Sequence, residues 1–272
     1  MNRITVLCFG ASYAVALGVE LVELLWPRPV QRLIGLSFAT AGLAAHTLFL
    51  AAQPLALATQ FWSTIFLAWI LAIFYLYGSL HHRRRAWGVF VLPLVLGLIA
   101  LSLTFDRRNG GSVDLWGLLA IRGERFWLIA HVMLLLLAAV GVCVGFVSSL
   151  MYLIQARRLR AKKVPALGFR LLSLERLEAM NRRAIVLAFP LLTAGVLIGT
   201  ALIAQRPGQF RDWTDPKIVG TIALWLVFAL VFFLRHTRQV AGRQLALLTI
   251  VAFALLLFTL ASSHPIVLGG PR

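Results

Sequence analysis

The sequence predicts an all-α fold, a polytopic membrane helix bundle with about eight transmembrane helices, built as one domain over residues 1–272. Hydrophobic residues make up 61% of the chain and charged residues only 13%, whereas a soluble domain is roughly half apolar and a quarter charged. Apolar runs of about 20 residues, the length that crosses a bilayer, recur along the chain. No stretch resembles a second, soluble domain.

The apolar runs place eight spans, over residues 4–26, 33–52, 61–77, 87–105, 126–154, 184–204, 218–234 and 245–262. The first run is longer than the apolar h-region of a usual signal peptide and only Arg3 precedes it as a positive charge, so we expect it to be retained as a helix. The fifth is long enough to tilt or to project beyond the bilayer. Before the sixth, Leu171, Leu174 and Leu177 have helical spacing, which predicts a short surface helix over 171–183, with a solvated basic connector as the alternative.

The distribution of positively charged residues predicts how the chain is oriented in the membrane. The formal net charge of +17 would indicate nucleic acid in a soluble protein, but here the basic residues lie in short connections between apolar runs. They gather within residues 28–32, 83–85, 157–183 and 235–243, which are alternate connections between the spans and therefore lie on one side of the membrane. Because basic loops stay in the cytoplasm, both termini are expected to be extracytoplasmic. Membrane lipid is an expected partner and nucleic acid is not.

Two outer segments carry polar and aromatic residues. The loop 205–217 holds two prolines, a glycine and Trp213, so its backbone cannot continue a helix through hydrocarbon. Residues 106–125 begin polar and become apolar over 115–121, which predicts a segment on the membrane surface or over the outer mouth. These segments mark the outer face as the candidate site.

His131 and His264 lie on this outer side, within the fifth span and directly after the eighth. An ionisable residue at membrane depth indicates function, although each can also be a packed histidine bonded to a carbonyl. Together with Trp213 they offer two axial ligands for a haem iron and an aromatic surface for the macrocycle. Outer arginines suit haem propionates: Arg122, Arg125, Arg206 and Arg211.

No Cys-x-x-Cys-His occurs in the sequence, so any haem, of the b type, is expected to be held non-covalently. His46 lies well inside the second span beside small residues that leave room for close packing or a ligand. A rise of 1.5 Å per residue puts it on the order of 20 Å from His236 along the membrane normal. On that estimate the two histidines do not share an iron.

At the cytoplasmic boundary, His81, His82 and His236 are expected to be solvated interfacial histidines. Glu20 and Glu23, near the inner end of the first span, are expected to pair with Arg28 or Arg32 rather than to transfer protons.

Four stretches carry a family resemblance: residues 172–183, Phe189-Pro-Leu-Leu-Thr-Ala-Gly195, Asp215-Pro-Lys217 and Leu224-Trp-Leu226. With His131-Val132, they resemble the cytochrome c assembly family of CcsA, CcmC and HemX-like membrane proteins. The resemblance covers the second half of the chain closely. It extends to the first half loosely, through His46 and residues 66–69.

The resemblance implies an external tryptophan-rich loop that presents haem, with His131 and His264 as its external ligands. Trp213 and Asp215 would belong to this loop, which also contains Arg211, and Arg125 is expected on the same outer side of the membrane. The resemblance also implies a histidine pair within the membrane. His46 and the His236 that ends the seventh span match that pair, against the distance estimate above, and both possibilities stay open.

The chain departs from the family pattern, because Trp213 stands alone, Ile218 occupies the position of an acid and Gly220 that of a further tryptophan. It therefore resembles the divergent HemX-like branch. We expect a multi-pass protein of the bacterial cytoplasmic (inner) membrane that presents haem at the extracytoplasmic face in cytochrome c maturation. Expected partners are apocytochrome c and a periplasmic or membrane assembly protein.

Three other functions were weighed. The first is a HemX-like accessory or regulatory protein that keeps the fold without functional haem ligation. A transporter is less favoured because the two halves show no matching broken helices. An enzyme with its own reaction is also less favoured, because no acid, base and nucleophile fall on one face.

Overall fold

The computed structural model describes residues 2–26, 28–52, 59–81, 87–105, 124–162, 172–205, 215–237 and 242–262. Within these ranges the chain forms eight α-helices and no strand, which confirms the all-α prediction. The helices are α1 (Asn2–Leu25), α2 (Pro29–Ala51), α3 (Gln60–His81), α4 (Gly88–Ser102), α5 (Glu124–Arg160), α6 (Leu174–Ala204), α7 (Pro216–Thr237) and α8 (Gly242–Ala261).

Seven of these helices are long and apolar enough to cross a membrane. The exception is α4, an apolar helix of 15 residues that contains Pro93. The long fifth span is confirmed as the 37-residue α5. The chain is thus a multi-pass membrane protein.

The helix expected to lead into the sixth span is confirmed from Leu174, and the alternative of a solvated connector is wrong there, because α6 is one continuous helix from that residue. Leu171 lies outside the described residues. The first turns of α6 are held against α5. Leu177 is fully buried, and Asn181 Nδ2 donates a hydrogen bond of 2.7 Å to Ser149 Oγ. These contacts favour extension of the spanning helix over a separate surface helix.

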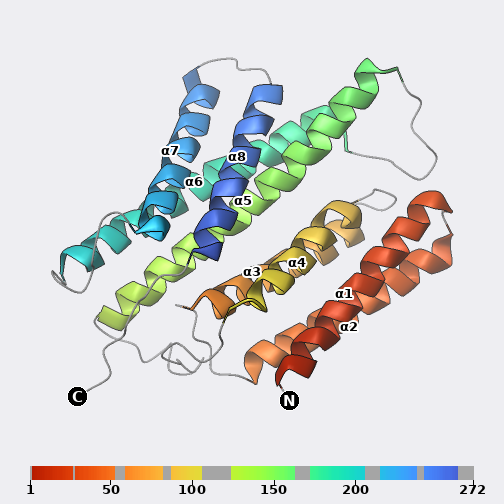
Figure 1. Cartoon of the computed structure of the whole chain (residues 1–272). Helices are drawn as coiled ribbons and strands as arrows, with labels where there is room; N and C mark the ends of the chain where they lie inside the picture. The colour runs from red at the N-terminus through yellow and green to blue at the C-terminus, as the bar shows by residue number, and fades with distance from the viewer. Residues whose placement is uncertain are drawn as a thin grey trace.

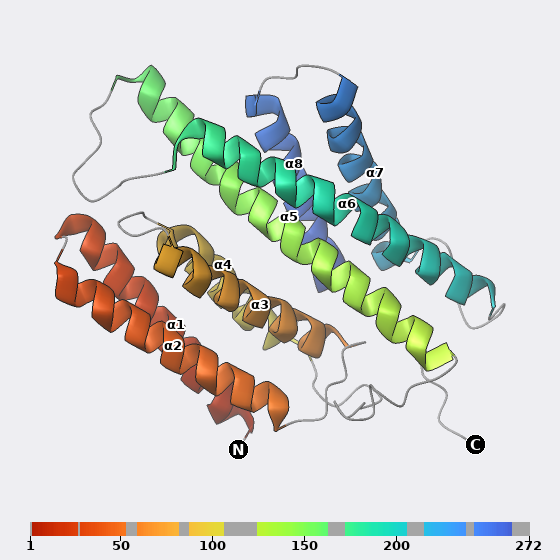
Figure 2. The ribbon, with the colours of Figure 1, turned by 180° about the vertical axis from the view of Figure 1, so that it is seen from behind.

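The helices form two groups, α1–α4 and α5–α8, which lie side by side (Figures 1 and 2). Consecutive helices run antiparallel, and the closest pairs are α5 with α6 and α1 with α2. The two groups meet mainly through α3, which touches α5 and α8. At one end of this junction Gln60 Nε2 donates a hydrogen bond to the Ser262 carbonyl.

The last turns of α1, α3, α5 and α7 and the first turns of α2, α4, α6 and α8 all lie at one end of the bundle (Figure 1). We call it the basic end, because the described residues there include Arg28, Arg32, Arg157, Arg158, Arg160, Lys162, Arg176, Arg182, Arg183 and Arg243. The opposite end holds the start of α1 and the end of α8. The predicted clustering of positive charge therefore holds in three dimensions.

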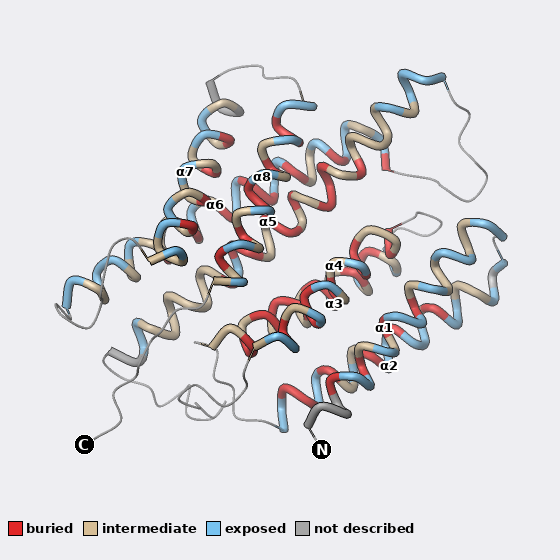
Figure 3. Tube along the Cα trace, in the orientation of Figure 1, coloured by how far each residue is buried: buried red, intermediate tan, exposed pale blue. Residues whose placement is uncertain are grey.

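Buried residues gather where α3, α4 and α5 face one another and their neighbours, and exposed residues lie mainly on the outward faces (Figure 3). The α5–α6 contact is close because Gly141 lies against α6, where an added Cβ would come within 2.6 Å of Ala188 Cβ. Gly141 and Gly145 form a Gly-x-x-x-Gly pattern on α5, an arrangement that lets membrane helices approach closely.

A polar cluster joins α1, α2 and α3 toward the basic end. Tyr75 Oη donates a hydrogen bond of 2.9 Å to Glu20 Oε1, and Arg32 Nη2 donates one of 3.0 Å to the Ser79 carbonyl. Arg32 attracts Glu20 electrostatically, as expected. The hydrogen-bond partner of Glu20 is nevertheless Tyr75 of α3, which the sequence did not indicate.

Candidate functional site

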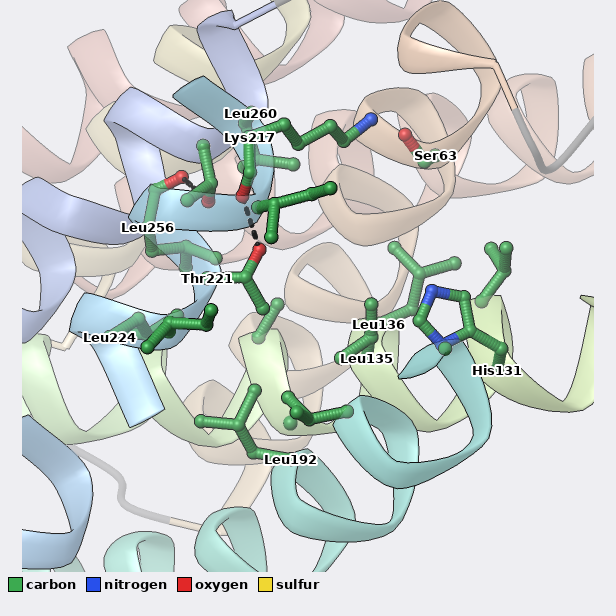
Figure 4. Close-up of a pocket in the computed structure, with 18 of the residues that line it drawn as sticks. Ser63, His131, Leu135, Leu136, Leu192, Lys217, Thr221, Leu224, Leu256 and Leu260 are labelled. Carbon is green, nitrogen blue, oxygen red and sulfur yellow. Dashed lines mark hydrogen bonds between the residues drawn. The ribbon is translucent and has the colours of Figure 1, made fainter. Parts of the chain in front are cut away.

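A cavity of about 250 Å³ lies among α3, α5, α6, α7 and α8, toward the end opposite the basic end (Figure 4). Leucine, isoleucine, valine and alanine side chains form most of its wall. Its polar lining residues in the described part of the chain are Ser63, His131, Thr200, Lys217, Thr221 and Thr259. Such a site, apolar with a few directed polar groups, is typical of small-molecule binding.

His131 lies in the second turn of α5 and is half-buried in the cavity wall. Its Nδ1 lies 2.7 Å from the Gly195 carbonyl oxygen of α6. A carbonyl only accepts hydrogen bonds, so Nδ1 carries the proton and the lone pair of the imidazole is on Nε2. This is the arrangement that orients metal-ligating histidines.

Gly199, one turn beyond Gly195 on α6, provides the space for the His131 ring. A Cβ added at Gly199 would lie 2.6 Å from His131 Cε1 and 3.0 Å from its Nδ1. Carbon atoms in contact are normally about 3.5–4.0 Å apart, so any larger residue would displace the ring. The ring orientation therefore depends on a glycine of the facing helix.

Asp215 and Lys217 begin α7 at the other side of the cavity. The Lys217 backbone N–H donates a hydrogen bond of 2.8 Å to Asp215 Oδ1, which caps the helix start. The Lys217 side chain extends along the cavity toward Ser63 of α3 (Figure 4). The Asp-Pro-Lys motif thus contributes a capping carboxylate and a cavity-lining ammonium group.

His46 lies in the other group of helices and does not reach this cavity. It is fully buried on α2, and its ring stacks on Phe9 of α1 with centroids 4.1 Å apart. Tyr13 approaches its edge at 6.2 Å. The ring faces the backbone of Ile65, yet neither nitrogen makes a hydrogen bond of acceptable geometry to any described residue.

His236 lies in the last turns of α7, near the basic end and in the group of helices that does not contain α2. The structure therefore does not bring His236 and His46 together. The side chains of His236 and Arg125 are not described, and His264, Trp213 and Arg211 lie outside the described residues. His81 stacks on Tyr77 at the exposed end of α3, as expected for an interfacial histidine.

Sequence reasoning missed Gly195, Gly199 and the side chain of Lys217. Gly195-Val-Leu-Ile-Gly199 is a Gly-x-x-x-Gly pattern within an apolar run, which indicates close helix approach. That pattern could have identified α6 as the partner of a neighbouring helix. Nothing in the sequence could have shown that the approaching group is the His131 ring.

The fold and cavity define a polytopic membrane protein with a histidine-bearing apolar site. A sequence model of the family described as Cytochrome C assembly protein matches residues 57–266, and the chain belongs to this family. Relatives named cytochrome c biogenesis protein CcsA include one from Gloeobacter violaceus, 26% identical over 243 residues and 70% of each chain. Others come from Synechococcus elongatus, 28% over 233 residues and 70% of each chain, and from Picosynechococcus, 27% over 279 residues and 80% of each chain.

Proposed function

We propose that this chain is a haem-handling membrane protein of cytochrome c maturation, and that haem is its cargo. In this proposal His131 binds the iron from the cavity between α5 and α6, and His264 supplies the second external ligand. Trp213 stacks on the macrocycle, and Arg125 and Arg211 meet its propionates. The haem is of the b type, is held non-covalently and is presented at the extracytoplasmic face of a bacterial cytoplasmic membrane.

The contact between His131 Nδ1 and the Gly195 carbonyl oxygen is the observation that carries the proposal. The 2.7 Å contact to the Gly195 carbonyl fixes the proton on Nδ1, so the lone pair needed for an iron bond is on Nε2. The apolar wall around it suits the body of a porphyrin. Membership of the cytochrome c assembly family, and the name cytochrome c biogenesis protein carried by the relatives, support haem as the ligand.

In this proposal the protein's own side chains and backbone groups bind and orient haem and do not change it chemically. The Gly195 carbonyl holds the His131 ring in one tautomer, and Gly199 leaves room for that ring against α6. The apolar lining excludes water from the iron side of the ligand. Haem supplies the iron centre, and apocytochrome c with a periplasmic or membrane assembly partner would receive it.

The visible spectrum of the purified protein tests this function. After haem-replete expression, the wild type is expected to show a Soret band, and His131→Ala is expected to lose most of it. His81→Ala is the matched control, because His81 is an exposed histidine near the basic end. A wild-type protein without a Soret band would refute haem binding.

A second candidate, a HemX-like accessory protein without functional haem ligation, is favoured by one observation. Gly220 occupies a position where the family pattern has tryptophan, and an added Cβ there would lie 2.6 Å from Thr259 Cγ2 and 3.2 Å from Phe258 Cδ1. Helix α8 thus fills the space that a tryptophan would need. Under this alternative, His131→Ala and His264→Ala leave cytochrome c levels unchanged in cells.

Of the two histidines proposed as a pair within the membrane, only His46 keeps a proposed role as an iron ligand. Its two ring nitrogens are buried and have no hydrogen-bond partner among the described residues, which is costly unless a ligand meets them. His236 shares no group of helices with it. If His46 binds iron, its partner ligand is therefore expected to come from a nearer helix than α7.

A further inference from the structure

Lys217 is the one lysine, arginine or carboxylate side chain among the described residues that line the cavity. Its place is fixed, because Asp215 caps α7 through the Lys217 backbone N–H and the side chain leaves the first helical turn toward the cavity. Figure 4 shows Nζ directed toward Ser63, across the cavity from His131. The cavity therefore has an imidazole at one side and an ammonium group at another.

The other polar side chains that line the cavity do not neutralise the positive charge of the Lys217 ammonium group. Their hydroxyls donate to carbonyls of their own helices: Ser63 to Gln60 at 3.1 Å, Thr200 to Leu197 at 2.9 Å, Thr221 to Lys217 at 2.7 Å and Thr259 to Leu256 at 2.8 Å. In the described part of the chain, no acceptor makes a hydrogen bond with Lys217 Nζ. Asp215 attracts the ammonium group electrostatically, but Asp215 is not one of the residues that line the cavity.

An ammonium group at the wall of an apolar cavity attracts an anion more strongly than an ammonium group in open water does, because a low-dielectric surrounding weakens the interaction less than bulk water. The rest of the wall is apolar. A matching ligand therefore has an apolar body and an anionic group at its edge.

We infer that Lys217 is the anion-recognising residue of the cavity and pairs with the carboxylate of an amphipathic ligand whose body lies against the apolar wall. This inference rests on the proposed function and deepens it, because haem carries two propionate carboxylates. A lipid phosphate offers the same type of anionic partner. Lysine binds either as a point charge, without the bidentate geometry of arginine.

The test compares haem with haem dimethyl ester, which keeps the macrocycle and the iron but lacks the carboxylates. Both are titrated into the full chain in nanodiscs of zwitterionic lipid. Wild type is expected to bind the diacid roughly 10- to 100-fold more tightly than the ester, the range for a hydrogen bond to a charged group. Lys217→Met is expected to bind both with the wild-type affinity for the ester, whereas Lys217→Arg keeps the preference for the diacid.

Lys162→Met is the matched control, because it removes the same charge from an exposed lysine at the basic end of α5. It is expected to behave as wild type. Equal weakening of diacid and ester binding by Lys217→Met would assign Lys217 a structural role and overturn the inference. So would a wild type that binds both compounds equally.

If wild type binds neither compound, the haem proposal fails and the anion site is tested separately. Thermal unfolding is then compared in nanodiscs with phosphatidylglycerol and with phosphatidylcholine. Stabilisation by the anionic lipid that Lys217→Met loses and Lys162→Met keeps would support the anion site with a lipid as its source. No Lys217-dependent effect of either anion would overturn the inference.

Discussion

Replacing Gly199 with alanine tests whether the orientation of His131 matters for ligand binding. The new Cβ would lie 2.6 Å from His131 Cε1, so the ring must move by about 1 Å to restore normal carbon contacts. Its Nδ1 now lies 2.7 Å from the Gly195 carbonyl oxygen. A shift of that size lengthens the contact to about 3.7 Å, beyond hydrogen-bonding distance.

Gly199→Ala is expected to weaken haem binding more than it lowers the stability of the fold. Loss of the outer partner of a metal-ligating histidine typically weakens metal binding about 10- to 100-fold. The lost hydrogen bond destabilises the fold by about 1 kcal/mol, and alanine in place of glycine in a helix returns up to about 1 kcal/mol. The atom that must move is at the end of a side chain, so the backbone of α6 can stay in place.

We therefore expect Gly199→Ala to keep its thermal unfolding midpoint within a few degrees of wild type while haem affinity falls at least tenfold. Haem titration followed at the Soret band, beside thermal unfolding of the same preparation, measures both quantities. Gly97→Ala on α4 is the control, because no atom lies within 4 Å of a Cβ added there. Wild-type haem affinity in a folded Gly199→Ala protein would refute a role for the Gly195 contact in positioning His131.

Three further outcomes are expected. Gly141→Ala should destabilise the protein by about 1–3 kcal/mol, because its Cβ would meet the backbone of α6 as well as a side chain. Unfolding by denaturing detergent measures this effect. An unfolding midpoint as high as that of Gly97→Ala would contradict the close α5–α6 contact. A double-mutant cycle of Glu20→Gln and Tyr75→Phe, measured in the same way, should give a coupling free energy of about 1 kcal/mol or more. Additive effects would mean that the 2.9 Å hydrogen bond between these residues contributes nothing to stability. His46→Phe should keep or raise the unfolding midpoint of the haem-free protein, because it removes two buried nitrogens that have no described hydrogen-bond partner. A marked loss of stability would show that those nitrogens do make hydrogen bonds.

The sequence by itself determined the helices and the end at which positive charge collects. Apolar runs long enough to cross hydrocarbon must form helices, because no other local structure satisfies their backbone groups there. This rule predicted eight spans from composition alone; in the structure seven helices are long and apolar enough to cross a membrane, and the eighth predicted span is the shorter α4. It does not account for the start of α6, where the helix begins at Leu174, before the apolar run, and Leu177 is buried.

The tertiary structure decided which side chains meet. His131 was predicted as a site residue from its depth in the membrane, but its tautomer follows from Gly195, which is 64 positions away in sequence. The direction of the Lys217 side chain depends likewise on where α7 packs against α6 and α8. Contacts of this kind depend on the rotation and spacing of neighbouring helices, which a pattern within one helix does not encode. The same limit kept His46 and His236 open as a pair until the packing placed them in separate groups of helices.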